Sequence, residues 1–181
     1  MKTLMRGAAV GLALALGAQV AQAQAGLSLG LGAGAVIPTG SMADLNSTGW
    51  TGQTSLRVKP AVSPLGFQVD ASYSRMGFDQ GDGHMSTLAG TANAVYAFPS
   101  AAAARPYLIG GLGVYNMRAG GEAVTKFGGN AGAGFDLKLG SASLYAEGRF
   151  HAILNGGINE TGEEATAYMI PLTVGLRWSL R

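Results

Sequence analysis

Apolar and polar residues alternate in eight segments that cover most of the chain beyond residue 25. In L-Y-A-E-G-R-F-H at 144–151, Leu144 and Phe150 belong to an apolar or small set, whereas Glu147 and Arg149 belong to the intervening polar set. Successive side chains of a strand leave opposite faces, so this alternation predicts β-strands. The predicted strands are residues 26–38, 50–59, 65–76, 86–98, 107–118, 126–138, 144–151 and 168–180.

The lengths of the segments and of their connections favour a membrane barrel over a soluble sandwich. Most segments have about 10–13 residues, which exceeds the usual soluble strand and suits a strand tilted across a bilayer. The connections after the second, fourth and sixth segments are short, and the others are longer and polar: 39–49, 77–85, 119–125 and 155–167. We therefore predict an all-β fold, a closed eight-stranded antiparallel up-and-down transmembrane barrel with short periplasmic turns and longer outer loops.

Aromatic residues decide which face points outward. Nearly all of them fall on the apolar face, many near segment ends, as in the aromatic girdles of membrane barrels. The predicted lipid-facing girdle consists of Trp50, Phe67, Tyr73, Tyr96, Phe127, Phe135, Phe150, Tyr168 and Trp178, with Phe98 beside it. Tyr145 is the clearest exception. Segment 107–118 is compatible with either facing, and we interpret its tyrosine face as outward: Tyr107, Ile109, Tyr115 and Met117.

The opposite face is rich in glycine and small polar residues and carries charges of both signs. The chain contains 30 glycines, and a charge facing lipid costs about 2–4 kcal/mol at the midplane. These charges are therefore expected inside, where a narrow barrel must be filled by its own side chains. We expect Arg57 near Asp70, and Arg177 near Tyr145 and Glu147. The predicted structural lumen network consists of Arg57, Asp70, Asp136, Glu147, Arg149, His151 and Arg177.

The N-terminus has the layout of a secretory signal peptide. Lys2 and Arg6 precede a short apolar run, and small residues follow at A-Q-A-Q-A, 21–25. We predict a signal peptide at 1–23, with cleavage after Ala23 or Ala25, and a barrel domain at 24–181. The full chain has 12 basic and 10 acidic residues. Cleavage removes Lys2 and Arg6, so the mature chain has equal numbers of basic and acidic residues. A near-neutral mature chain does not favour nucleic-acid binding, and the absence of cysteine excludes a disulfide framework.

Candidate catalytic and metal-binding patterns are weak. Glu147, Arg149 and His151 share one strand face, but a filled barrel offers little room for a substrate, and a structural ion-pair network is the favoured interpretation. D-Q-G-D-G-H at 79–84 has oxygen ligands but lacks the remaining acidic positions of a calcium loop, and N-E-T-G-E-E at 159–164 suits a solvated loop tip. His84 with Ser86 is a faint candidate for catalysis. We expect no cofactor, no metal and no catalytic residue.

Four stretches carry a resemblance to a known family: P-Y-L-I-G-G-L-G at 106–113, G-G-N-A-G-A-G-F-D at 128–136, Y-A-E-G-R-F-H at 145–151 and I-P-L-T-V-G-L-R-W at 170–178. With these the chain resembles the OmpA/OmpX-like eight-stranded outer-membrane barrels, often labelled outer-membrane β-barrel domain. Members commonly end on an aromatic residue read by the assembly machinery, whereas this chain ends W-S-L-R. The resemblance implies a barrel fold and outer-membrane location, and such barrels serve many roles.

We therefore expect a non-enzymatic integral outer-membrane barrel with an envelope-structural or surface-interaction role. A narrow small-solute channel is the alternative, and a lipid-modifying enzyme is a third and weaker one. The expected partners are outer-membrane lipid and, during biogenesis, periplasmic chaperones and the barrel-assembly machinery. We expect a monomer that does not bind nucleic acid.

Overall fold

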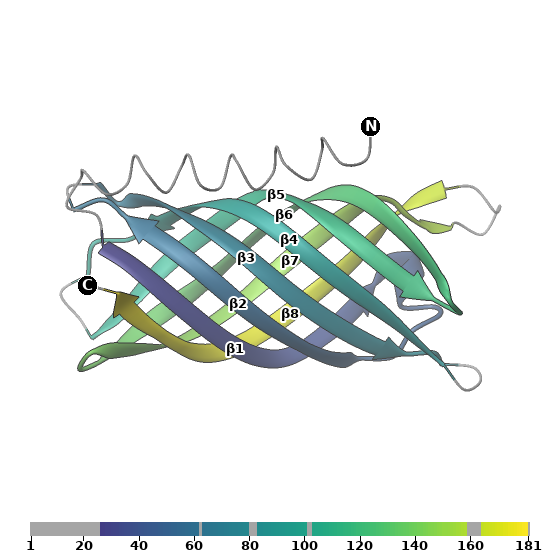
Figure 1. Ribbon diagram of the computed structural model, residues 1–181, viewed down its shortest axis with the longest axis horizontal. Helices are drawn as coiled ribbons and strands as arrows, with labels where there is room; N and C mark the ends of the chain where they lie inside the picture. The colour runs from purple at the N-terminus through teal and green to yellow at the C-terminus, as the bar shows by residue number, and fades with distance from the viewer. Residues whose placement is uncertain (1–25, 62, 80–82, 101–102, 159–163, 181) are drawn as a thin grey trace.

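The protein is a closed antiparallel barrel of eight strands joined in chain order (Figure 1). The computed structural model describes residues 26–180 apart from 62, 80–82, 101–102 and 159–163. The predicted signal peptide and both of its cleavage sites lie outside the described residues. The strands are β1 Gly26–Thr39, β2 Gly49–Lys59, β3 Leu65–Gly77, β4 His84–Ala97, β5 Ala104–Ala119, β6 Glu122–Leu139, β7 Ala142–Ile158 and β8 Glu164–Leu180.

Pairing of the first strand with the last closes the sheet. Leu27 of β1 lies opposite Leu180 of β8, and the register continues to Thr39 opposite Tyr168. On its other side β1 pairs with β2, from Gly26 opposite Lys59 to Val36 opposite Gly49. Closure satisfies the backbone groups that a free sheet edge leaves unpaired, which is what a lipid environment requires. The predicted eight-stranded antiparallel barrel is confirmed.

The two ends of the barrel differ. We call the end that holds Gly26, Leu180 and the connections after β2, β4 and β6 the terminal end, which lies at the left of Figure 1. The other end, called the loop end, holds the connections after β1, β3, β5 and β7, and the 3-10 helix Gly40–Met42 is part of the first of these. The described residues contain no helix long and apolar enough to cross a membrane.

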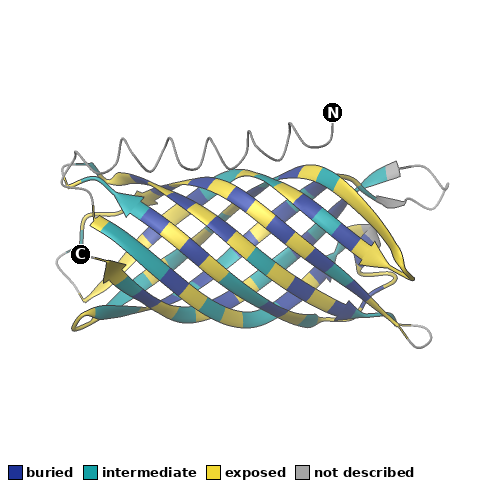
Figure 2. Ribbon diagram, in the orientation of Figure 1, coloured by how far each residue is buried: buried dark blue, intermediate teal, exposed yellow. Residues whose placement is uncertain are grey.

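Strand periodicity is visible as a checkerboard of buried and exposed residues over the barrel wall (Figure 2). On β3 the pattern is strict, because Phe67 and Val69 are exposed while Gln68 and Asp70 are buried. The inverted polarity, with apolar side chains outside and polar ones inside, is that of a protein whose outer surface meets hydrocarbon.

The interpretation of segment 107–118 is wrong, because β5 faces the other way. Tyr107, Ile109, Tyr115 and Met117 are buried in the lumen, and Leu108, Leu112 and Val114 are exposed outside. Glycine explains how a narrow lumen accepts these tyrosines. Tyr107 lies opposite Gly134 of β6, where an added Cβ would meet its ring at 2.6 Å, and Tyr115 packs against Gly113 and Gly128. Tyr145 fits between Gly32 and Gly175 in the same way.

The predicted long loop at 119–125 is also wrong. The β5–β6 ladder continues to Ala119 opposite Glu122, so the connection is the two-residue turn Gly120–Gly121. Both glycines have positive φ, +57° and +91°, as tight hairpin turns require. Residues 118–125 are exposed on both faces of the hairpin, so this hairpin extends beyond the barrel wall at the loop end.

A hydrophobic cluster fills the lumen at the loop end. It contains the five methionines of the described chain, together with other buried apolar residues and the partly buried Phe78. We call it the methionine cap: Val36, Met42, Met76, Met85, Ala89, Tyr115, Met117, Ile153, Ala167 and Met169. Methionine is flexible and fills irregular space well, so side chains close this end of the lumen.

Candidate functional site in the barrel lumen

Asp70 is the centre of the buried polar network below the methionine cap. This β3 carboxylate accepts four hydrogen bonds: from Gln68 Nε2 (2.7 Å), Thr91 Oγ1 (3.2 Å), Asn93 Nδ2 (2.7 Å) and Arg149 Nη1 (2.9 Å). The donors come from β3, β4 and β7, and all five residues are buried. A buried carboxylate is tolerated when its lone pairs are satisfied in this way.

Arg149 joins Asp70 to a second buried carboxylate. Its Nε donates to Glu147 Oε1 at 2.8 Å, and its side chain is 3% exposed. Glu147 also accepts hydrogen bonds from Tyr107 Oη at 2.9 Å and Gln53 Nε2 at 3.3 Å. These contacts connect β2, β3, β5 and β7, so the network crosses the lumen instead of following one hairpin.

Asp136 forms a separate group nearer the terminal end. Its two carboxylate oxygens receive Arg57 Nη1 at 2.9 Å and Arg177 Nη1. The guanidinium of Arg57 also lies over the Tyr107 ring at 4.3 Å, and that of Arg177 over the Tyr145 ring at 4.5 Å. Both cations are therefore held by a charge on one side and an aromatic face on the other.

Two expected pairings differ from those observed. Arg57 forms its ion pair with Asp136 of β6 instead of Asp70, and Gln68 bridges the two groups by accepting from Arg57 and donating to Asp70. Arg177 lies beside Tyr145 as expected, but its ion pair is with Asp136 and not with Glu147. For Arg57 the partner sits across the lumen, because β2 and β6 are on opposite sides of an eight-stranded barrel.

His151 belongs to the layer next to the methionine cap. It hydrogen-bonds Tyr115 Oη through Nδ1 at 2.8 Å, with the two rings edge to face. Below it, Asn130 Nδ2 donates to Asn93 Oδ1 at 2.8 Å. His151 is 3% exposed, so its ring is enclosed by the surrounding side chains.

Of the seven predicted lumen residues, Asp136 is partly buried and the others are buried. The sequence placed five neutral partners on the inward polar face but left them out of the predicted network: Gln53, Gln68, Thr91, Asn93 and Asn130. Two further partners, Tyr107 and Tyr115, were assigned to the outer face. Gln53, Gln68 and Asn130 alternate in phase with charged residues on their own strands, and that shared parity was the signal for their position.

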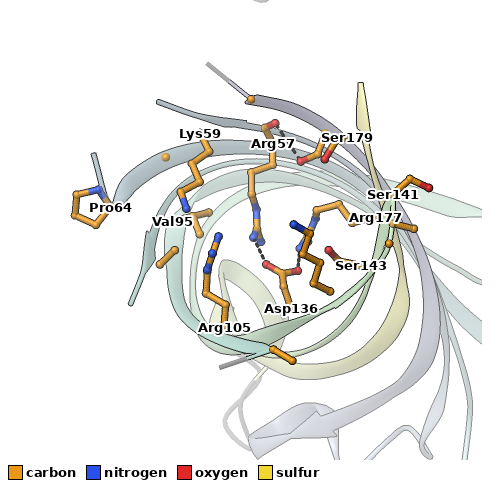
Figure 3. A pocket seen from close by; sticks show the side chains of 18 residues that line it. Arg57, Lys59, Pro64, Val95, Arg105, Asp136, Ser141, Ser143, Arg177 and Ser179 are labelled. Atoms are coloured by element: carbon orange, nitrogen blue, oxygen red, sulfur yellow. Dashed lines mark hydrogen bonds and ion pairs between the residues drawn. The ribbon is translucent and has the colours of Figure 1, made fainter. Parts of the chain in front are cut away.

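A cavity of about 680 Å³ occupies the lumen at the terminal end (Figure 3). Arg57, Asp136 and Arg177 are among its lining residues. Further lining comes from Lys59, Arg105 and Lys138, from Ser28, Ser143 and Ser179, and from small residues such as Gly26 and Gly66. Toward the loop end the polar network and the methionine cap fill the lumen.

Outside the lumen, the aromatic residues gather in pairs. The ring centroids of Trp50 and Tyr73 lie 5.5 Å apart near the loop end, and the stacked rings of Phe150 and Tyr168 have centroids 5.3 Å apart. Tyr96 and Phe98 pair near the terminal end at 5.1 Å. The predicted girdle residues are exposed apart from Tyr168 and Trp178, which are partly buried. Their role as a membrane girdle stays a prediction.

The faint catalytic candidate has a different partner. His84 Nδ1 lies 3.0 Å from Arg75 Nη2 at the outer rim of the loop end. Residues 80–82 of the 79–84 motif, and 159–163 of the second acidic loop, lie outside the described residues. In the described part of the chain, no group of three histidine or acidic side chains is arranged to hold a metal.

An antiparallel barrel with an apolar outer wall and a charged, filled lumen defines the class of transmembrane β-barrels. The chain belongs to the outer membrane protein beta-barrel domain family, whose model matches residues 7–178. It is therefore an outer-membrane protein. No curated relative matches the chain.

Solved structures share the fold at low sequence identity. Neisserial surface protein A is 18% identical with a TM-score of 0.67, over 85% of this chain and 97% of that one. A major outer membrane protein of Thermus thermophilus is 12% identical with a TM-score of 0.61, over 86% and 99%. These likenesses concern the fold alone.

Proposed function

We propose that the protein is a non-enzymatic outer-membrane barrel whose role is envelope structure or surface interaction. The main observation in support of this proposal is the ion pair of Asp70 with Arg149, which connects strands on opposite sides of the lumen. A second crossing, from Arg57 to Asp136, lies nearer the terminal end. A solute would have to displace both buried pairs, and each charge left unpaired is costly.

The methionine cap supports the same proposal from the other end. Met76, Met169 and Ile153 are at most 1% exposed, so water reaches little of the cap. A small-solute channel needs a continuous wet path, and here apolar packing adjoins the polar network. The channel alternative therefore receives less support than the closed barrel.

Planar-bilayer recording tests the proposal directly. The refolded protein is expected to give no stable openings, with a large porin as the positive control and empty detergent as the blank. Openings whose frequency rises with the amount of protein would contradict a closed lumen. A gel comparing boiled and unboiled samples checks in the same preparation that the barrel is folded.

A non-enzymatic role is supported by the surroundings of the histidines. His151 is enclosed and contacts Tyr115, and the side-chain partner of His84 is the Arg75 guanidinium, not the carboxylate or serine that a catalytic histidine needs. Acyl transfer by the wild-type protein that His84→Ala abolishes would overturn this part of the proposal.

The remaining expectations concern biogenesis. We retain the signal peptide at 1–23, a monomeric state, and contact with lipid, periplasmic chaperones and the assembly machinery as proposals. Mass measurement of protein purified from outer membranes distinguishes cleavage after Ala23 from cleavage after Ala25. Retention of residues 1–23 would contradict the signal peptide.

A further inference from the structure

The cavity at the terminal end holds more positive charge than its carboxylate can balance. Its described lining contains one carboxylate, Asp136, and five cations: Arg57, Lys59, Arg105, Lys138 and Arg177. Figure 3 shows Arg57 and Arg177 joined to Asp136, with Lys59 and Arg105 beside them in the same cavity. Lys59 interacts electrostatically with Arg105 and Arg57 as well as with Asp136. Positive charges that lie close together repel one another, and an anion bound among them offsets this repulsion.

The two arginines on the cavity floor have side-chain N–H groups without a described acceptor. The side chains of Arg57 and Arg177 are 8% and 6% exposed, and each gives its Nη1 to Asp136. Among the described groups, Nη2 of Arg57 and both Nε and Nη2 of Arg177 have no acceptor. These three atoms are closed to solvent, so an anion in the cavity first meets Lys59, Arg105 and Lys138. It reaches the free arginine donors only when the arginine side chains shift toward it.

We propose that this cavity binds a phosphate-bearing anion with at least two negative charges. Guanidinium groups match phosphate oxygens with paired N–H donors, and lysines add point charges. Ser28, Ser143 and Ser179 supply hydroxyl groups in the cavity wall. Small-molecule sites commonly have volumes of about 300–1,000 Å³, so the cavity accommodates a pyrophosphate or a small phosphorylated molecule.

The phosphate has two possible sources. In outer-membrane barrels the short turns lie on the periplasmic side, so the terminal end is expected to open to the periplasm. A soluble phosphate compound enters from that side through the mouth of the lumen. A phospholipid of the adjoining leaflet reaches the same cations by folding its headgroup over the rim.

Calorimetric titration of the folded barrel with pyrophosphate tests the site. The protein is held in a maltoside detergent, which carries no phosphate, at low chloride concentration. One saturable site is expected, with affinity that falls as salt is added. Absence of saturable binding under these conditions overturns the proposal.

Two variants and one matched control locate the site. Arg105→Gln and Lys138→Gln each remove a cation from the exposed part of the cavity, and neither residue is in a described ion pair. Each variant is expected to weaken pyrophosphate binding about tenfold, the loss of one charge-assisted hydrogen bond. Arg118→Gln makes the same charge change at the loop end and is expected to have no effect. An equal loss in Arg118→Gln would show nonspecific charge attraction and overturn the site.

Nanodiscs distinguish the two sources. Pyrophosphate binding that is the same in phosphatidylcholine and in phosphatidylglycerol discs supports a soluble phosphate compound. Pyrophosphate binding that is suppressed in phosphatidylglycerol discs, but is present when the same protein is in maltoside, supports a lipid headgroup in the same site. The test is independent of conductance, so a failed anion site and a failed closed-lumen proposal give different results.

Discussion

Asp70 of β3 and Arg149 of β7 form an ion pair of 2.9 Å across the lumen, between strands that lie on opposite sides of the barrel. Both side chains are 3% exposed. The pair therefore connects the two halves of the wall from inside, where neither charge is stabilised by bulk water. Each charge depends on the other and on its neutral neighbours.

Replacement of Asp70 by Asn keeps the shape of the side chain and removes its charge. Arg149 retains Glu147, so we expect the free energy of unfolding to fall by about 3 kcal/mol, the lower part of the range for breaking a buried pair. Urea unfolding in lipid vesicles measures the change. Asp44→Asn, at an exposed position of the first loop, is the matched control and should shift stability by less than about 0.5 kcal/mol. Similar effects of both changes would contradict a stabilising role for the lumen pair.

The facing of β5 can be tested at Leu112, which is 75% exposed on the outer wall. Leu112→Arg puts a charge toward hydrocarbon and should destabilise the barrel by about 2–4 kcal/mol if the position is near the midplane. Leu112→Ala should cost much less, because it removes outward apolar surface without adding a charge.

Fluorescence gives an independent measure of the same facing. In a background where Trp50 and Trp178 are replaced by Phe, a tryptophan at position 112 should be quenched by lipids brominated on their acyl chains. A tryptophan at position 115 should be quenched weakly, because Tyr115 is buried in the lumen. The reverse pattern would restore the facing that aromatic residues alone suggested.

The error at β5 shows what strand periodicity can and cannot predict. Alternation located all eight strands, because a side-chain period of two is a local property of the chain. The facing of β5 depends on β6, where Gly134 makes room for the Tyr107 ring. Tyr145 was recognised as an inward exception, and Gly175, its neighbour on β8, makes room for its ring in the same way. A tyrosine opposite a glycine on the next strand therefore indicates an inward-facing tyrosine. This signal can be used only when the register of the two strands is known.

Adding a single methyl group tests this packing. An added Cβ at Gly134 would lie 2.6 Å from the Tyr107 ring and from the Ala146 carbonyl oxygen, so Gly134→Ala should destabilise the barrel by about 1–3 kcal/mol. Gly90 has no described atom within 4 Å of the same position. Gly90→Ala should be neutral or should stabilise by up to about 1 kcal/mol, since glycine weakens strand interiors. Equal destabilisation by the two variants would mean that the tyrosine contacts do not determine the requirement for glycine.

The methionine cap predicts resistance to oxidation. The cap methionines are at most 8% exposed, so hydrogen peroxide should convert them to sulfoxides far more slowly in the folded barrel than in urea. Mass spectrometry of peptides resolves each site. Rapid oxidation of Met76 or Met169 in the folded protein would show that the cap opens to water and would revive the channel alternative.

Ion-pair partners were less predictable than strands. The sequence indicated which charges lie inside, because a charge on the lipid face is costly. Neighbouring strands were the available guide to pairing, and they led to Arg57 with Asp70. The observed partner, Asp136, depends on the width of the lumen and the stagger between distant strands. Gln68 occupies the place between Arg57 and Asp70, which a count of charges does not reveal.

The β5–β6 hairpin beyond the barrel wall has a consequence for recognition. Its backbone is held by the ladder up to Ala119 and Glu122 and turned by two glycines. Binding to a loose loop carries an entropic penalty, because the loop must adopt a single conformation in the complex. A receptor or antibody that docks on this hairpin meets a shape that is already fixed. At this position, point changes on the hairpin surface should alter the fit with a partner directly, without a change in loop ordering.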